Sequence, residues 1–389
     1  MRRKTGSGKE LIGGMALALL AGWSLLPLPA RAETREFPSK KALLTVETLA
    51  SGLQQPWSVE VLPEGGYLVS EKAGTLRLVH GDNISAPIGG VPAVATDGQG
   101  GLLDIALAPD FAESRTLYLT YSARGDGGAG TAVARARLSD DGTRLEDLTR
   151  IFLMSRLTPK GQHFGSRIAI ARDGSLFFGI GDRGEGSRAQ DPRDHAGAIL
   201  HINPDGTPHK DNPFLGTSAG LAEIWSKGHR NPQGLAIDPK DGTLLTAEHG
   251  ARGGDEINNP QPGRNYGWPL VSYGRHYSGA EFDLGSSAEG YEPPLYYWDP
   301  SIAPGAIAVY RGAMFPEWDG NLIVAALKYQ LVARLERDEG GAIVSEERLF
   351  DGEFGRIRDV VVAPDGALLL LTDEANGALL RVSRDDTAD

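Results

Sequence analysis

Short apolar or alternating stretches recur along the chain, separated by turns rich in Gly, Asp and Asn. The pattern is clear in residues 57–79, 168–181, 235–248 and 360–382, and weaker in 103–138 and 306–335. The turns carry Asp-Gly, Gly-Gly or Asn-Gly pairs, as at Asp173-Gly174 and Asp365-Gly366, which is hairpin chemistry. Few windows show apolar residues at helical spacing for more than two turns. The pattern therefore predicts an all-β protein made of six hairpin units.

Six such units predict a six-bladed β-propeller of four-stranded antiparallel sheets. A pair of packed β-sheets is the alternative, but repeated apolar-x-Asp-Gly turns favour blades. The unit lengths vary, so insertions must lie in loops, the largest of them at residues 183–227 and 259–305. We expect residues 33–389 to form a single catalytic propeller domain.

Residues 1–32 have the features of a cleaved export signal. A basic start with Arg2, Arg3, Lys4 and Lys9 precedes a mostly apolar run, and Ala30-Arg31-Ala32 fits a small-residue cleavage site. A single membrane anchor is the alternative use of the apolar run. Glycines, Trp23 and prolines interrupt that run, and no stop-transfer pattern follows it. The sequence therefore predicts a periplasmic protein without stable membrane insertion.

Charge and cysteine content narrow the classes of function. The chain has 39 basic and 51 acidic residues; residues 1–32 hold five and one of these, so 34 and 50 remain, with a net charge of −16. This deficit, with no basic stripe to offset it, argues against nucleic acid as a partner. The absence of Cys excludes disulfides, thiolate metal sites and cysteine nucleophiles. The sequence does not decide between a monomer and a homodimer.

Candidate chemistry gathers at the ends of the predicted strands. His163 precedes one strand and Asp182 follows the next, so a hairpin could bring an imidazole and a carboxylate together at one rim. A His oriented by a carboxylate is suited to act as a general base near neutral pH. A loop His beside an Asp turn, with no catalytic role, is the alternative. Arg230-Asn231 precedes a further strand, and its guanidinium suits an anion or a developing negative charge, or else a structural ion pair.

Two other segments suggest ligands. The loop from Gly250 to Glu256 offers closely spaced carbonyls and carboxylates, which suit calcium, although its spacing is not that of an EF-hand. Arg356 and Arg358 stand two residues apart and so point to the same side of an extended segment, and Lys328 follows another strand. Three such cations invite a polyanionic ligand, and pairing with the plentiful acids is the alternative.

Taken in order, these motifs resemble the soluble, periplasmic quinoprotein sugar dehydrogenases, which are pyrroloquinoline quinone (PQQ)-dependent aldose sugar dehydrogenases of the glucose/sorbosone dehydrogenase family. The resemblance runs from about Leu49 to Val382 and rests on these segments: His163-Phe-Gly-Ser-Arg167, Ile180-Gly-Asp182, Arg230-Asn-Pro-Gln-Gly234, Glu248-His-Gly250, Asp255-Glu256-Ile-Asn258, Asn265-Tyr-Gly-Trp-Pro269, Ala326-Leu-Lys328 and Arg356-Ile-Arg-Asp359.

The resemblance implies a role for each matching residue. His163 would remove the proton of the anomeric hydroxyl of an aldose, Asp182 would orient it, and Arg230 would polarise the quinone carbonyl. The cofactor-binding residues implied are Gln99, Gln162, Arg230, Asn231, Lys328, Arg356 and Arg358. The carbonyls of Gly250 and Ala251 would hold the calcium ion that activates the quinone, and Glu256 and Tyr266 would belong to a second, structural calcium site. Electrons would pass to a periplasmic acceptor.

Two positions depart from the family pattern. Ser166 stands where relatives often have Gly, which places a side chain near His163. Ala251 stands where relatives often have Pro, a change that a carbonyl ligand should survive. A calcium-dependent propeller lactonase is the alternative enzyme, and a propeller that only binds a ligand is a third possibility. The lactonase gives no reason for the Lys328, Arg356 and Arg358 group, and a propeller that had lost activity would be expected to lose His163 or Arg230.

Overall fold

The computed structural model describes residues 34–384, so the predicted export signal lies outside the described residues. Six antiparallel sheets account for nearly all its regular structure. The first two sheets contain β3 (Pro56–Val61), β4 (Tyr67–Glu71), β5 (Thr75–His80) and β6 (Asn83–Ile84), then β7 (Leu102–Leu107), β8 (Thr116–Gly125), β9 (Gly128–Leu138) and β10 (Leu145–Leu153). The next two contain β11 (Ile168–Ile170), β12 (Leu176–Ile180), β13 (Ala198–Ile202) and β14 (Ile224–Lys227), then β15 (Pro232–Ile237), β16 (Leu244–Glu248), β17 (Asp255–Asn258) and β18 (Tyr296–Trp298).

The last two sheets complete the set. The fifth contains β19 (Pro304–Val309), β20 (Leu322–Ala326), β21 (Leu331–Arg337) and β22 (Ile343–Leu349). The sixth joins β23 (Ile357–Val362), β24 (Leu368–Thr372) and β25 (Gly377–Arg384) to β1 (Thr34–Pro38) and β2 (Leu43–Leu53). The only helical pieces in residues 34–384 are α1 (Phe111–Ser114) and two 3-10 turns, Gly186–Gln190 and Pro316–Trp318. None of these helices is long and apolar enough to cross a membrane.

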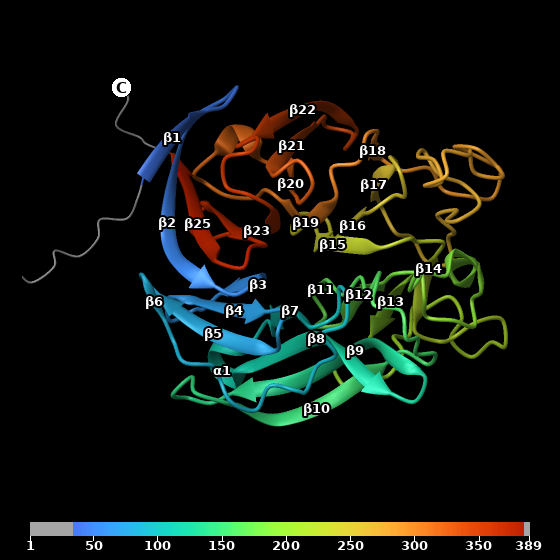
Figure 1. The fold of residues 1–389 in the computed structure, drawn as a ribbon, viewed down its shortest axis with the longest axis horizontal. Coiled ribbons are helices and arrows are strands. Elements are labelled where there is room, and N and C mark those ends of the chain that lie inside the picture. The colour runs from blue at the N-terminus through green and yellow to red at the C-terminus, as the bar shows by residue number, and fades with distance from the viewer. Residues whose placement is uncertain (1–33, 385–389) are drawn as a thin grey trace, which may run out of the picture. The chain divides into compact units, whose positions relative to one another are not determined.

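The sheets are the blades of a ring, as Figure 1 shows. The first strand of each blade contacts the first strand of the next, from β3 through β7, β11, β15 and β19 to β23, and β23 contacts β3 again. The predicted six-bladed propeller is therefore confirmed. One blade differs from the prediction, because β1 adds a fifth strand at its outer edge.

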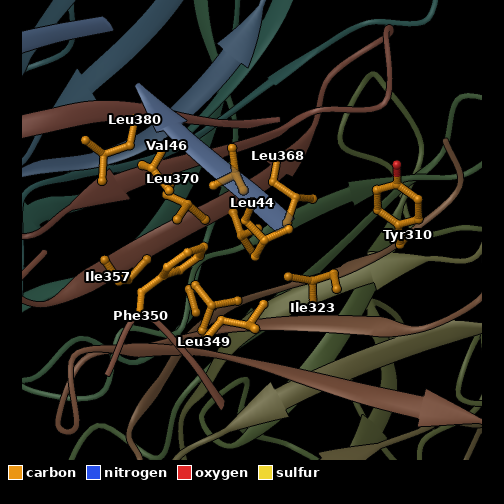
Figure 2. Packing of buried hydrophobic residues seen from close by; sticks show 14 of the residues in the cluster. Leu44, Val46, Tyr310, Ile323, Leu349, Phe350, Ile357, Leu368, Leu370 and Leu380 are labelled. Carbon is orange, nitrogen blue, oxygen red and sulfur yellow. The ribbon is translucent and has the colours of Figure 1, made fainter. Parts of the chain in front are cut away.

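The ring closes by pairing strands from the two ends of the described chain. β2 lies antiparallel to β25, with Val46 opposite Val382. Figure 2 shows the packing beneath this pair, where Leu44 and Val46 of β2 lie with Leu368 and Leu380 of the sixth blade and with Ile323 of the fifth. Apolar contact between neighbouring blades thus holds the ring together.

The turns explain why the hairpin pattern predicted the blades well. Gly174 and Gly366 have φ values of +85° and +88°, which L side chains rarely adopt, and each lies between the first and second strands of its blade. These turns place the starts of the first strands and the ends of the second strands on the opposite face of the ring. The candidate site residues lie at those strand ends.

Candidate functional site

His163 and Asp182 form the hydrogen-bonded pair predicted from the hairpin. His163 Nδ1 lies 2.6 Å from Asp182 Oδ1, and both side chains are buried. Within residues 34–384 no hydrogen bond reaches His163 Nε2, so this ring nitrogen remains available as a proton acceptor. Because the carboxylate accepts a hydrogen bond from Nδ1–H, the proton stays on Nδ1 and the pair fixes the tautomer that a general base needs.

Asp182 is held by three donors. Its Oδ1 also accepts the Gly184 N–H at 2.7 Å, and its Oδ2 accepts the Trp268 indole N–H at 2.7 Å. Burial alone would raise the pKa of Asp182, but the hydrogen bond and charge of His163, the Gly184 N–H and Arg230 together lower it. The carboxylate is therefore ionised and fixed in orientation.

His163 itself is held by its backbone. The residue has a φ of +54°, uncommon for a non-glycine residue, and its N–H donates to Gln99 Oε1 at 2.7 Å. Arg183, fully buried beside Asp182, donates to the carbonyls of Gln162 and Lys160. The Gln99 side chain thus contacts the backbone of the candidate base, whereas Gln162 supports the loop through its own backbone carbonyl.

The Ser166 departure has a structural explanation. Its φ is +96°, a region that favours Gly, and the side chain is completely buried. The hydroxyl donates to the Phe164 carbonyl at 3.0 Å. Ser166 therefore occupies a glycine-like position, with its hydroxyl turned to the backbone of its own loop.

Arg230 approaches the pair from the next blade. Its backbone carbonyl accepts the Asp182 N–H at 2.8 Å, and its own N–H donates to Glu248 Oε2 at 2.9 Å. The guanidinium donates to the His249 carbonyl at 3.2 Å and to the Tyr277 hydroxyl at 3.3 Å. Its Nε is buried without a partner. The Nε–H of Arg230 is therefore available to donate a hydrogen bond to a ligand.

A cavity of about 410 Å³ opens beside these residues. Its lining includes Gln99, Asn231, Arg356 and Arg358 together with Phe164, the neighbour of His163. This volume is in the range of cofactor and substrate pockets. The structure therefore brings four of the predicted cofactor-binding residues to one cavity.

The two arginines share one carboxylate in the cavity wall. Arg358 Nη2 and Arg356 Nη2 lie 2.7 and 3.3 Å from Asp373 Oδ2. Burial lowers the pKa of Arg358 although Asp373 opposes this, and the Arg358 Nε has no partner. The lining also holds Lys72 and Glu374, so three cations against two anions leave the wall with a positive excess. Lys328 lies apart: it is exposed, with its ammonium 5.1 Å from the Tyr329 ring centre.

The loop after β16 has the shape of a carbonyl cradle. A Cβ atom on Gly250 would lie 2.2 Å from the carbonyl oxygens of both Gly253 and Gly254, so only glycine fits there. Asp255 shapes this loop, because its carboxylate accepts the N–H groups of Gly250 and Ala303 at 2.8 and 2.6 Å. Carbonyl oxygens are suitable ligands for calcium, but the close-packed ones belong to Gly253 and Gly254, so the predicted ligation by Gly250 and Ala251 stays a prediction.

A second group of oxygens surrounds Glu256. Burial and the neighbouring Glu248 carboxylate raise the pKa of Glu256 to about 8, and Asn258 Oδ1 is buried without a partner. Tyr266 stacks on His229, whose Nδ1 lies 2.9 Å from Glu248. Two close carboxylates and a free amide oxygen fit a cation. No cluster of three or more metal-binding His, Asp or Glu side chains occurs in the described part of the chain.

Several residues that contribute to the site were assigned no role from the sequence. Gln233 bridges Arg358 and the Gly165 carbonyl, at 3.0 and 3.2 Å. His249 lines the cavity, and burial together with the charges of Arg230 and Arg358 lowers its pKa to about 3, so it is neutral. Asp373 and Trp268 were missed as well. A comparison of the repeats would not have found Asp373, because the residues that directly follow β4 and β16 are Lys72 and His249.

Comparison with known proteins identifies the family. The chain matches the glucose/sorbosone dehydrogenase family over residues 53–381. The chain belongs to this family. It is 43% identical, over 88% of this chain and 93% of the relative, to the aldose sugar dehydrogenase YliI of Escherichia coli strain K12. The predicted resemblance and the assignment as a sugar dehydrogenase are thereby confirmed.

Solved structures of this glucose/sorbosone dehydrogenase family share the fold. The apo form of the soluble aldose sugar dehydrogenase from Escherichia coli superposes with a TM-score of 0.84 at 43% identity, covering 88% of this chain and 100% of that one. The PQQ-bound aldose sugar dehydrogenase from Streptomyces coelicolor gives 0.72 at 29% identity, covering 91% and 99%. Members of the family thus include an enzyme with bound PQQ.

Proposed function

We propose that this protein is a PQQ- and calcium-dependent dehydrogenase that oxidises the C1 hydroxyl of aldoses to the lactone and passes electrons to an external periplasmic acceptor. One observation carries the proposal. The oriented base pair of His163 and Asp182 and the partly unpartnered guanidinium of Arg230 stand beside a cavity whose wall has a cationic excess.

The residues divide the work as follows. His163 Nε2 accepts the proton of the C1 hydroxyl, while Asp182 stabilises the resulting imidazolium. Arg230 neutralises the negative charge that develops on the group that accepts the hydride of the sugar. Arg356 and Arg358 bind carboxylate groups through charge-assisted hydrogen bonds. When bound, PQQ supplies the two-electron acceptor for the hydride of C1, and Ca²⁺ supplies a Lewis acid.

The cation sites fit the same proposal. The carbonyls around Gly250 and Ala251 would hold the calcium ion next to the cofactor, and Glu256 with Tyr266 would hold the structural ion. Gln99, Gln162 and Asn231 would contact the cofactor, and Lys328, which follows the cavity-lining Leu327, would pair with its carboxylates. Residues 1–32 would direct export and be removed.

The propeller axis favours a dehydrogenase over the lactonase alternative. A lactonase of this fold would bind calcium through carboxylates that converge on the axis. Here Asp104 and Asp359 lie 2.7 and 3.1 Å from Arg167 Nη1, so both carboxylates already have an arginine as their ion-pair partner. These carboxylates are therefore engaged in an ion-pair cluster with Arg167, which supports the dehydrogenase over the lactonase.

The test is dye-linked oxidation of aldoses by the protein purified without residues 1–32. We expect activity only when both PQQ and Ca²⁺ are added, together with a change in quinone absorption on addition of glucose. Lactone hydrolysis is measured in parallel with and without Ca²⁺. Calcium-dependent hydrolysis without sugar oxidation or PQQ binding would replace the proposal with the lactonase.

A further inference from the structure

Trp268 lies in the long loop between β17 and β18, and its peptide groups are fixed at both ends. Its N–H donates to the Gly228 carbonyl at 2.9 Å, and its carbonyl accepts the Gln190 side chain at 2.6 Å. The ring of Phe282 packs edge-on against the indole, with centroids 5.3 Å apart. The indole therefore has a defined position rather than that of a free loop side chain.

Two functional groups meet this one indole. Its N–H donates to Asp182 Oδ2 at 2.7 Å, the oxygen that does not contact His163. The Arg230 guanidinium carbon lies 5.1 Å from the indole ring centre, within range of a cation–π contact. Trp268 thus contacts both the carboxylate behind the candidate base and the candidate electrophile, although the two belong to neighbouring blades.

We propose that Trp268 is a positioning residue that fixes Asp182 from its second oxygen, and thereby sets how readily His163 takes up a proton, while its ring face holds Arg230. This inference rests on the proposed function of His163 as the base. With donors on both oxygens, the Asp182 carboxylate cannot turn away from the imidazole. The indole N–H also disperses negative charge that would otherwise act entirely on the imidazolium.

The charges around His163 give the sign of the effect. The groups that face it are Asp182, Arg183, Arg230 and the neutral His249. Asp182 is the only carboxylate that contacts the ring within residues 34–384. If Asp182 loses the hydrogen bond from the indole N–H, more of its negative charge acts on the imidazole of His163. The imidazolium becomes more stable, and the base stays protonated to a higher pH.

The test replaces Trp268 by Phe, which removes the N–H and keeps a ring for Arg230 to face. The His163 ring resonance is followed by NMR against pH in cofactor-free protein and assigned with a His163→Gln spectrum. We expect its midpoint to rise by about one pH unit, with the acid limb of the kcat/KM profile moving in parallel. An unchanged midpoint would overturn the inference.

A matched control is Trp298→Phe. The Trp298 indole N–H also donates to a carboxylate, that of Glu346 at 3.2 Å, but in the outer part of the fourth blade. This variant should leave the His163 midpoint and the acid limb where they are. An equal shift in both variants would show a general effect of losing a buried indole and would also refute the proposal.

A second variant separates the two contacts. Trp268→Leu removes both the N–H and the ring face, so it should add a fall in kcat to the shift that Trp268→Phe produces. Failure of the wild-type protein to oxidise any aldose with PQQ and Ca²⁺ would refute the proposed function. The NMR titration needs no turnover, so it would still decide whether Trp268 acts through Asp182.

Discussion

At the residue scale, the candidate site depends on a few side chains fixed by more than one partner. His163 is held at its ring by Asp182 and at its backbone by Gln99. Such support from two sides keeps a group within the narrow range of orientation that proton transfer needs. The orientation of His163 is therefore set by protein groups before any substrate binds.

Substitution of His163 by Ala should remove the base and leave the cavity walls intact. We expect kcat to fall by about 10²–10⁴-fold, because this is the usual contribution of a general base. PQQ binding, measured by fluorescence titration, should remain near that of the wild type. His80→Ala, at the exposed end of β5, is the control. Near-normal turnover in His163→Ala would remove His163 from the mechanism.

The sequence was sufficient to predict His163 with Asp182, because both stand at the ends of one hairpin. It could not predict that Asp373 pairs with Arg358, since these residues meet only when β23 and β24 are in register. Trp268 was within a recognised motif, but its contact with Asp182 crosses 86 positions of sequence. Long-range side-chain contacts of this kind depend on how loops fold back over neighbouring blades, and local patterns carry no information on that.

At the scale of the element, the first strand of each blade has two different ends. The start of β23 carries Arg358 toward the cavity, whereas the far part of β3 carries Glu60 toward the opposite mouth of the channel. Burial, reinforced by Asp104 and Asp359, raises the pKa of Glu60 to about 8. The first strands of the blades therefore place an arginine, Arg358, at one end of the channel and a protonated acid, Glu60, at the other.

Glu60 should make the stability of the protein depend on pH. Its pKa in the folded protein is near 8 and lies above the unfolded value of about 4.3. The folded protein therefore retains this proton to a higher pH than the unfolded chain does. Between these values unfolding releases a proton, and stability falls as pH rises. Glu60→Gln should match the wild type at about pH 4 and exceed it near pH 8.5 by on the order of 2 kcal/mol in urea unfolding. The exposed Glu113→Gln is the control, and a pH-independent difference would contradict the assignment.

Elements were predicted unevenly, and the reason is physical. First and second strands, which are joined by tight Gly turns, followed directly from the sequence. Outer strands such as β14 and β18 have only four and three residues and follow long loops, so no periodicity could reveal them. The extra strand β1 escaped notice because it is a five-residue edge strand that alternates only between exposed and half-buried positions, with Phe37 as its one large apolar side chain.

At the scale of the whole molecule, the propeller depends on one closing contact between the two ends of the described chain. β2 supplies the fourth strand of a blade whose first three strands come from the C-terminal end. Each other blade is continuous in sequence. Arg356, which precedes β23, and Asp373, which follows β24, therefore belong to the blade that this contact completes.

Two adjacent residues of β2 make this dependence measurable. Leu44 is completely buried between the fifth and sixth blades, whereas Leu43 is 41% exposed on the other face of the strand. Leu44→Ala should lower the free energy of unfolding by about 3 kcal/mol, because it leaves a cavity in the core. Leu43→Ala should change it by less than about 0.5 kcal/mol. Urea unfolding compares the two.

The same pair of variants also tests whether closure supports the site. If β2 stabilises the sixth blade as a unit, Leu44→Ala should weaken the hold of Arg356 and Arg358 on an anion before the whole ring unfolds. Binding of PQQ should then weaken at urea concentrations where the other five blades still show native tryptophan fluorescence. Loss of binding and loss of fluorescence at one common midpoint would instead mean that the ring unfolds as a single cooperative unit. In that case the closing strand stabilises the whole molecule and has no separate effect on the cofactor cavity.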